Sequence, residues 1–311
     1  MQRDSVASLS VDAFPARVTI VEVGPRDGLQ NEAASVPTDA KVALIDALSA
    51  SGLAHIEVTA FVNPARIPQL ADAEEVCKRI ARRDGVIYSA LVPNERGYER
   101  ATGDAGLRDV AVFLSASETH NQRNIGCSIA EALDRFAPVL ARAATDGVRV
   151  RGYVSTAFGC PYEGNVAIEQ VVRTARALLD LGCAQVSLGD TTGMGDPRQV
   201  AATVRALEAP IEQVALHLHD TRGTGLANAL AGLSEGVTTF DASVGGLGGC
   251  PYAPGATGNV ATDELVYMFE KMGVDTGVDV RALLDAAEAI GAVLGKEVPS
   301  RYLKATRASE A

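Results

Sequence analysis

Short apolar runs rich in β-branched residues alternate with longer segments of helical periodicity along almost the whole chain. A short run of this kind is typical of a buried strand, and apolar residues three or four positions apart predict a helix with one buried face. The pattern predicts strands near residues 18–23, 54–59, 86–92, 109–115, 148–155, 184–188, 213–219 and 238–243. It predicts helices near residues 38–51, 68–83, 94–103, 128–146, 166–181, 197–208, 224–235 and 261–272, and a further one at 279–295.

This order gives eight successive strand–helix units, without a break in composition or a linker rich in proline or serine. Such alternation predicts a parallel sheet, and eight units is the number that closes a (β/α)8 barrel, the TIM-barrel fold. We therefore expect a single catalytic α/β domain over residues 1–311, with the barrel at about 17–273 and a helical extension at 274–311. The length of 311 residues and the apolar content of 47% also permit two smaller domains.

The composition of the chain indicates what kind of partner it binds and in which compartment it lies. The net charge of −11 argues against nucleic acid or an anionic membrane surface as the main partner, so we expect a small molecule. No stretch reaches the roughly 18 apolar residues of a membrane span, and the N-terminus lacks a basic region followed by an apolar one. Five cysteines form no C-x-x-C pair, which fits a reducing compartment. These features together predict a cytoplasmic protein.

Polar residues stand where four of the predicted strands end. They are Arg26 and Asp27 after the first strand, Glu57 in the second, Asp190 after the sixth, and His217 and His219 in the seventh. In a barrel these ends form one face, and catalytic residues come from the ends of several strands. Taken singly, Asp190 is equally explained as a cap of the next helix, and Glu57 as the partner of a Lys or Arg at the rim.

His217 and His219 favour a metal site. Side chains at i and i+2 of a strand point to the same face, and imidazole is the commonest protein ligand for a transition metal. The alternative is a pair of histidines that only form hydrogen bonds in the barrel mouth. The dense glycines at 245–258 predict either a flap or a close approach of backbone to a ligand, and a thiol among them, Cys250, is more plausible near chemistry than in a core.

Two long motifs carry a resemblance to a known family. The chain reads VEVGPRDGLQNE at 21–32 and GLGGCPYAPGATGN at 246–259, with SASE at 115–118, NIGCSIAE at 124–131 and GCPYEG at 159–164 between them. In these motifs, and over nearly its whole length, the chain resembles 3-hydroxy-3-methylglutaryl-CoA lyases. The Arg-Asp pair and the H-x-H motif belong to a wider superfamily of metal-dependent barrels that make or break carbon–carbon bonds, whereas the cysteine flap is typical of the lyases.

The resemblance implies a ligand set for a divalent cation, Mg²⁺ or Mn²⁺. The implied ligands are Asp27, His217, His219 and Asn259. Carboxylate, imidazole and amide donors suit a hard or borderline ion, whereas a structural zinc ion would favour thiolates.

The resemblance also implies a reaction, a retro-Claisen cleavage of an acyl-CoA as in leucine degradation. A base removes the proton of the C3 hydroxyl, the C2–C3 bond breaks, and acetoacetate and acetyl-CoA leave. Arg26 and Gln30 would bind substrate, and Arg26 would also stabilise the enolate oxygen. Cys250 would deliver a proton to the enolate carbon, and Glu57 and Asp190 would position groups or relay protons. Barrels of this family commonly pair, so we expect a homodimer.

The sequence departs from the family in one loop. Where these lyases usually carry SFVSPKWVPQ, this chain has AFVNPARIPQ at 60–69, and Ala33 stands where Lys is common. The loss of a Trp predicts room for a C3 substituent longer than methyl, such as isohexenyl.

Two other functions remain open at this stage. The first is a condensing enzyme of the isopropylmalate synthase type. Such an enzyme would lack the cysteine flap and usually carries a C-terminal regulatory domain. Only about fifteen residues follow the last predicted helix, which is too few for such a domain. A scaffold that has lost activity would show a damaged ligand set, and the set here is intact.

Overall fold

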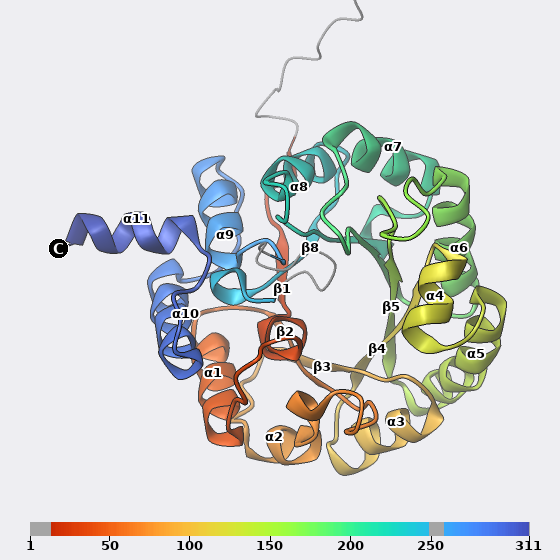
Figure 1. Ribbon diagram of the computed structural model, residues 1–311, viewed down its shortest axis with the longest axis horizontal. Coiled ribbons are helices and arrows are strands. Elements are labelled where there is room, and N and C mark those ends of the chain that lie inside the picture. The colour runs from red at the N-terminus through yellow and green to blue at the C-terminus, as the bar shows by residue number, and fades with distance from the viewer. Residues whose placement is uncertain (1–13, 249–257, 311) are drawn as a thin grey trace, which may run out of the picture.

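Eight parallel strands form a closed barrel in the order β1 to β8, with β8 pairing back onto β1 (Figure 1). The computed structural model describes residues 14–248 and 258–310. The strands are β1 Thr19–Glu22, β2 His55–Ala60, β3 Ile87–Leu91, β4 Asp109–Ser115, β5 Arg149–Ser155, β6 Gln185–Gly189, β7 Val214–His217 and β8 Thr239–Ala242. The predicted (β/α)8 fold is confirmed, because every predicted strand exists and takes its place in chain order.

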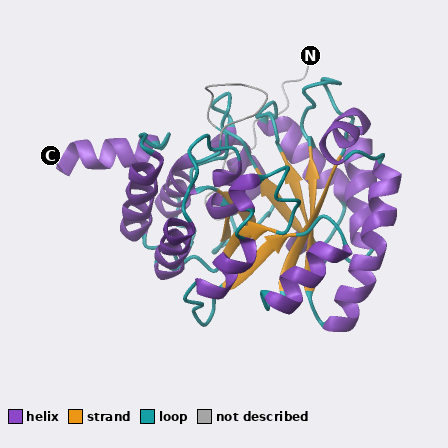
Figure 2. Cartoon of the chain, turned by 60° about the horizontal axis from the view of Figure 1, so that its bottom comes forward, coloured by secondary structure: helices purple, strands orange, loops and turns teal. Residues whose placement is uncertain are grey.

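Most of the helices surround the barrel and bury their apolar faces against it or against one another, and the last helix extends away from it (Figures 1 and 2). The helices are α1 Thr38–Ala50, α2 Ala73–Arg79, α3 Glu95–Glu99, α4 Glu118–Ile125, α5 Ile129–Asp146, α6 Ile168–Asp180, α7 Pro197–Leu207, α8 Gly225–Ser234, α9 Thr262–Lys271, α10 Val280–Leu294 and α11 Arg301–Glu310. The predicted helices at 68–83 and 94–103 are shorter: a 3₁₀ turn at Pro68–Leu70 precedes α2, and a π-helical turn at Arg100–Asp104 follows α3.

Two helices were not predicted, and their sequences explain why. Both α4 and α11 are strongly polar, and α11 buries only Leu303. Neither carries the apolar stripe on which a helix prediction from periodicity depends. By contrast α10, which was predicted, packs against α1 on the outside of the barrel. The loop after α1 and the loop before α10 approach closely: a Cβ on Gly52 would lie 2.3 Å from the carbonyl oxygen of Gly277.

The prediction that His219 lies in the seventh strand is wrong. β7 ends at His217, after which the chain leaves its neighbours in the barrel and pairs with a distant segment. The N–H of Asp220 donates to the Gly258 carbonyl at 2.7 Å, and the N–H of Val260 donates to the Leu218 carbonyl at 3.0 Å. His219 therefore lies opposite Asn259 in an antiparallel bridge. This bridge brings Asn259, which was also predicted to be a metal ligand, next to the histidines.

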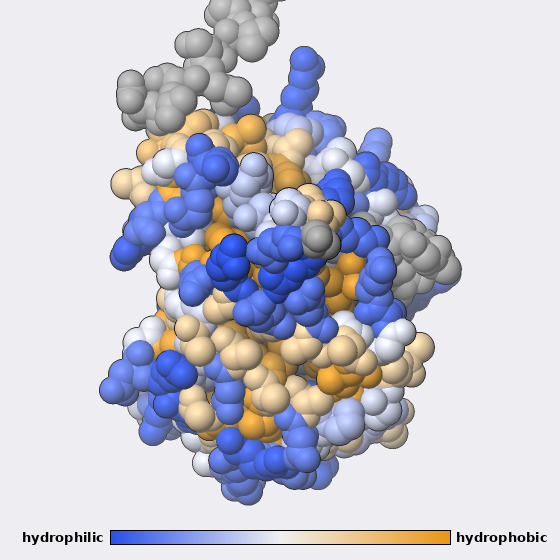
Figure 3. Space-filling view, turned by 90° about the vertical axis from the view of Figure 1, so that its left-hand side faces the viewer, coloured by the Kyte–Doolittle hydropathy of each residue, from blue (hydrophilic) through white to orange (hydrophobic). Residues whose placement is uncertain are grey.

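The side of the molecule that carries α9, α10 and α11 mixes hydrophilic and apolar patches (Figure 3). Tyr267 of α9 and Val293 of α10 are exposed there, at 43% and 45%. The four described cysteines, Cys77, Cys127, Cys160 and Cys183, are buried and unpaired with one another. Over the described part of the chain, every helix is too short or too polar to span a lipid bilayer.

Candidate active site

A tight turn after β1 presents Arg26 and Asp27 at the carboxyl end of the barrel. Gly24–Gly28 forms a single π-helical turn. The N–H groups of Arg26, Asp27 and Gly28 all donate to the carbonyl of Val23, at 3.1, 2.7 and 3.1 Å. Isolated π turns often occur at functional sites because they displace side chains from ordinary helical positions. This turn fixes two adjacent, oppositely charged side chains beside the ends of β2 and β7.

Asp27, His217 and His219 each offer a ligand atom within 4.8 Å of the others. His217 Nε2 lies 3.8 Å from Asp27 Oδ2, and the two imidazole rings are 5.4 Å apart. The fourth predicted ligand is next to them: the Asn259 amide donates to Asp27 Oδ2 at 2.8 Å and to the Leu247 carbonyl at 3.2 Å. The structure thus brings together all four residues predicted as metal ligands.

The protonation states of this cluster suit a cation. Burial opposes the charge on Asp27, but the charge of Arg26, together with the hydrogen bond from the Asn259 amide, outweighs burial and holds the pKa of Asp27 well below its usual value. Burial, followed by the proximity of His217, lowers the pKa of His219 to about 3, so this imidazole is neutral. Its buried Nδ1 atom has no hydrogen-bond partner among the described residues. An ionised carboxylate and neutral imidazoles are the forms that bind metals, so the residues fit a divalent ion.

Arg26 is held by two carboxylates. Its Nε donates to Glu57 and its Nη1 donates to Asp27, which leaves Nη2 without a hydrogen bond to the described residues. Tyr153 donates its hydroxyl to the other oxygen of Glu57 at 3.1 Å. Glu57 therefore pairs with an arginine, which was the alternative explanation for its position. The arginine with which it pairs is Arg26, the residue predicted to be catalytic. The arrangement orients one N–H face of Arg26 for a ligand.

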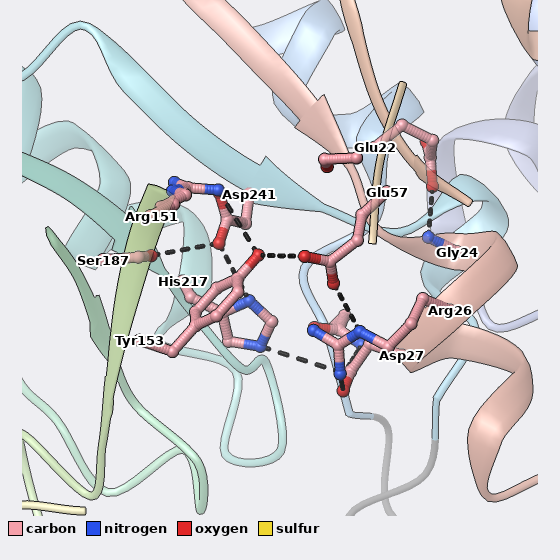
Figure 4. A network of polar contacts seen from close by, with 12 residues as sticks. Glu22, Gly24, Arg26, Asp27, Glu57, Arg151, Tyr153, Ser187, His217 and Asp241 are labelled. Carbon is pink, nitrogen blue, oxygen red and sulfur yellow. Dashed lines mark hydrogen bonds and ion pairs between the residues drawn. The ribbon is translucent and has the colours of Figure 1, made fainter. Parts of the chain in front are cut away.

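A second polar group inside the barrel orients His217, and the sequence interpretation missed it (Figure 4). Asp241 of β8 accepts from Arg151 at 2.6 Å and from Ser187 at 3.0 Å. His217 Nδ1 lies 3.2 Å from Asp241. The charge of Arg151 outweighs burial and lowers the pKa of Asp241, so this carboxylate only accepts hydrogen bonds. Nδ1 of His217 therefore carries a proton and donates it to Asp241, and this hydrogen bond turns Nε2 toward Asp27.

A signal for this group exists in the sequence. Arg151 and Tyr153 lie two residues apart in the middle of β5, and so point to the same face of a strand whose central residues are buried. A charged residue in the middle of a buried strand requires a partner. Its partner, Asp241, is 90 residues away, so local patterns do not identify it.

Asp190 lies beside the site without lining its cavity. Its carboxylate accepts from the N–H groups of Met194 and Gly195, at 2.9 and 3.1 Å, and burial raises its pKa to about 6. Its own N–H donates to the His217 carbonyl at 2.8 Å. Asp190 therefore organises the loop ahead of α7, whose N-terminus is capped by Asp196.

A cavity of about 460 Å³ opens above Arg26 and the histidines. Gln30, predicted to bind substrate, lies on its wall. Much of the remaining wall is apolar, formed by Val62, Ile67, Leu91, Phe113, Ile125 and Phe136. The site therefore combines a polar floor with a wall in which these apolar side chains stand among asparagines and arginines, which is typical of a pocket for a partly apolar small molecule.

The glycine-rich segment approaches the site closely, as one of the two interpretations of its glycines requires. Gly248 has a φ of +100°, and a Cβ there would lie 2.7 Å from the Asn259 amide nitrogen. Only glycine fits this conformation at this distance. Cys250, the predicted catalytic thiol, lies outside the described residues.

Glu22 joins the Arg26 turn to the start of the glycine-rich segment. One carboxylate oxygen accepts from the N–H groups of Gly24 and Val244, at 2.7 and 2.9 Å, and the other accepts from the Thr262 hydroxyl at 2.7 Å. Burial raises the pKa of Glu22 from 4.5 to about 7. The folded state therefore binds the Glu22 proton more tightly than the unfolded chain does.

Substitution Glu22→Gln is expected to remove a pH dependence of stability. Between pH 4.5 and 7 the unfolded chain has lost this proton while the folded chain keeps it, so the contribution to stability falls as pH rises. At about 1.4 kcal/mol per pKa unit, the difference in unfolding free energy between variant and wild type should shift by about 3 kcal/mol in favour of the variant between pH 5 and 8. Urea unfolding of both proteins at both pH values measures it. A constant difference would show that Glu22 titrates normally.

Substitution Tyr153→Phe tests whether the hydroxyl bond to Glu57 positions Arg26. Burial and the charges of Asp241 and Glu57 raise the pKa of Tyr153 well above 10, so the phenol stays a donor. Since one hydrogen bond contributes about 1 kcal/mol, kcat should fall roughly fivefold, with little change in melting temperature because the ring remains. Steady-state kinetics with thermal melting measure both. Unchanged kcat would show that Glu57 and Asp27 hold Arg26 without help.

Comparisons with known proteins agree with this geometry. Residues 17–290 match the family model described as HMGL-like. The chain is 51% identical over 298 residues to hydroxymethylglutaryl-CoA lyase YngG of Bacillus subtilis, covering 95% of this chain and 99% of the relative. It is also 51% identical over 294 residues to a 3-hydroxy-3-isohexenylglutaryl-CoA/hydroxy-methylglutaryl-CoA lyase of Pseudomonas aeruginosa, covering 94% and 98%. The structure of an HMG-CoA lyase from Acinetobacter baumannii in complex with coenzyme A and 3-methylmalate superposes with a TM-score of 0.89 at 42% identity, covering 93% and 95%.

Proposed function

Since this chain belongs to the HMGL-like family, we propose that it is a lyase that cleaves 3-hydroxy-3-methylglutaryl-CoA to acetyl-CoA and acetoacetate. The observation that carries the proposal is the convergence of Arg26 with the Asp27, His217 and His219 cluster on the floor of an apolar cavity. In this proposal residues 1–311 act as one catalytic domain, the substrate is an acyl-CoA, and neither nucleic acid nor membrane is a partner.

The proposed cofactor is Mg²⁺ or Mn²⁺, held by Asp27, His217, His219 and Asn259. A bound divalent cation would supply Lewis-acid polarisation of the substrate oxygens. Asp241 supports the binding of this ion by fixing the tautomer of His217. Asn259 orients Asp27 through its amide hydrogen bond.

Arg26 is proposed to stabilise the negative charge that develops on the thioester oxygen. When the C3 hydroxyl loses its proton and the C2–C3 bond breaks, the bonding electrons pass to the acetyl-CoA fragment as an enolate. The free Nη2 of Arg26 is a fixed donor for that oxygen, and Glu57 with Tyr153 holds the guanidinium in place. Asp190 keeps the loop next to His217 in position. On the family resemblance, Cys250 is proposed to deliver the proton that converts the enolate to acetyl-CoA.

The reaction is tested by incubating the purified protein with Mg²⁺ and 3-hydroxy-3-methylglutaryl-CoA, and measuring acetoacetate. Acetoacetate release supports the lyase. The competing condensation, of the isopropylmalate synthase type, would instead release free CoA thiol from acetyl-CoA and an oxo acid. Thiol release without acetoacetate formation would replace the lyase proposal with the condensing one.

A longer substrate is a second candidate, favoured by the apolar wall of the cavity. Val62 and Ile67 lie in the loop that departs from the family pattern, and they face the cavity together with Phe113. A relative 51% identical to this chain carries isohexenylglutaryl-CoA in its name. Thioesters with C3 methyl, butyl and isohexenyl groups test this candidate. A kcat/KM that rises with chain length supports the longer substrate, and a steep fall excludes it.

The cytoplasmic location and the homodimer remain predictions from the sequence. The exposed Tyr267 and Val293 lie on the side of α9 and α10. Sedimentation of the purified protein would measure its oligomeric state.

A further inference from the structure

The main cavity is rich in positive charge although the chain as a whole is acidic, at −11. Its ionised wall residues are three arginines, Arg26, Arg66 and Arg135, and one carboxylate, Asp27. Arg26 is already paired with Asp27 and with Glu57. The outer cations are therefore not neutralised by carboxylates of the cavity wall, and the opening attracts anions.

Arg66 is the cation best placed to meet a ligand. It lies in the exposed loop after β2, and its guanidinium makes no hydrogen bond or ion pair with the described residues. It lines both the main cavity and an adjoining recess of about 330 Å³. A cation shared by two connected hollows is positioned to bind a molecule that extends from one into the other.

The lining of the adjoining recess is mostly polar. Besides Arg66 the recess is lined by Gln30, Asn31, Glu32, Ala33, Ser35 and Gln69, with Ile67 and Pro68. Glu32 is its one carboxylate among these residues, and both of its oxygens accept from Lys296, at 2.8 and 2.6 Å. Arg66 is thus the unpaired charge of the recess. Amide and hydroxyl groups around one guanidinium suit an anionic, strongly hydrated part of a ligand.

Two departures from the family pattern meet in this recess. Ala33 stands where a Lys is common, and Arg66 stands where the usual residue is Trp. Both line the same hollow. The recess is therefore a part of the site in which this chain differs from that pattern.

We propose that Arg66 binds an anionic oxygen of the thioester substrate and thereby contributes to substrate selection. This inference rests on the proposed function, because the acyl-CoA supplies the anion. Two groups have this chemistry: a phosphate of coenzyme A and the free carboxylate of the glutaryl part. A guanidinium binds either through two parallel N–H groups, which an ammonium does not reproduce.

The test measures binding without turnover. Calorimetry with EDTA present gives the Kd of 3-hydroxy-3-methylglutaryl-CoA and of the matching pantetheine thioester, which keeps the carboxylate but has no phosphate. For Arg66→Gln, loss of a charge-assisted hydrogen bond should raise Kd about tenfold. A rise for the CoA thioester alone assigns the phosphates, and an equal rise for both assigns the carboxylate. Arg66→Lys should recover part of the affinity.

Arg198→Gln is the matched control, because Arg198 is an exposed arginine on α7, away from both hollows. It should leave both Kd values unchanged, and thermal melting should show all three variants folded. If Arg66→Gln binds both thioesters within twofold of wild type, the assignment of Arg66 is overturned. Failure of the proposed function is a separate result: wild-type protein that binds the CoA thioester, yet releases no acetoacetate when Mg²⁺ is added.

Discussion

The double substitution His217→Ala with His219→Ala is expected to abolish both metal binding and turnover. The two imidazoles are half of the proposed ligand set, both are buried, and burial lowers the pKa of His219 so that its imidazole is neutral. Loss of a residue that only supports a ligand typically costs 10- to 100-fold in metal affinity, so loss of two ligands should exceed roughly 100-fold. Electron paramagnetic resonance of added Mn²⁺ measures binding, and acetoacetate release measures turnover.

His55→Gln serves as the control for this variant. His55 is half-buried and lies at the first position of β2, at the opposite end of the barrel, where its Nε2 lies 2.8 Å from the Ser89 hydroxyl. Its replacement should leave Mn²⁺ binding unchanged. Stoichiometric Mn²⁺ binding and normal turnover in the double variant would place the metal site elsewhere.

The second large effect is expected for Arg26→Lys. Lysine keeps the charge but loses the planar group that bonds Glu57 and Asp27 while presenting Nη2 to the cavity. Removal of one donor to a developing oxyanion typically lowers kcat by roughly 100-fold or more, whereas a contact made only with bound substrate changes KM. Steady-state kinetics should therefore show a large fall in kcat with a small change in KM.

Mn²⁺ affinity separates the two possible causes of such a fall. If Arg26 acts on the substrate, Arg26→Lys should bind Mn²⁺ nearly as well as wild type, since Asp27 and the histidines remain. A loss confined to KM would show that Arg26 only binds substrate. A large loss of Mn²⁺ affinity would show that its main role is to hold Asp27.

The barrel could be predicted because its strands are buried on both faces and so appear as short, continuous apolar runs. Arg26, Asp27 and His217 could be predicted for a related reason. Each lies at or just after the end of a strand, and in a parallel barrel all strand ends meet on one face. Their convergence follows from the topology alone.

The remaining parts of the site depend on contacts between distant segments. His219 meets Asn259 through an antiparallel bridge outside the barrel, which no local pattern encodes. The ion pair between Arg151 and Asp241 joins β5 to β8, across 90 residues of sequence. It holds Asp241 in place, and Asp241 in turn orients His217. Asp190 was predicted to be a site residue, and its carboxylate accepts hydrogen bonds from the backbone of Met194 and Gly195, a contact that the sequence pattern does not predict.

The most direct test of the proposed reaction follows both carbon fragments at once. Wild-type protein is mixed with 3-hydroxy-3-methylglutaryl-CoA labelled with ¹³C at C2 and C3, first in EDTA and then with excess Mg²⁺, and the products are recorded by nuclear magnetic resonance. We predict no change in EDTA, then equal amounts of acetyl-CoA labelled at the methyl carbon and acetoacetate labelled at the ketone carbon. Intact substrate in the presence of Mg²⁺, or hydrolysis to free 3-hydroxy-3-methylglutarate and CoA, would contradict a metal-dependent lyase.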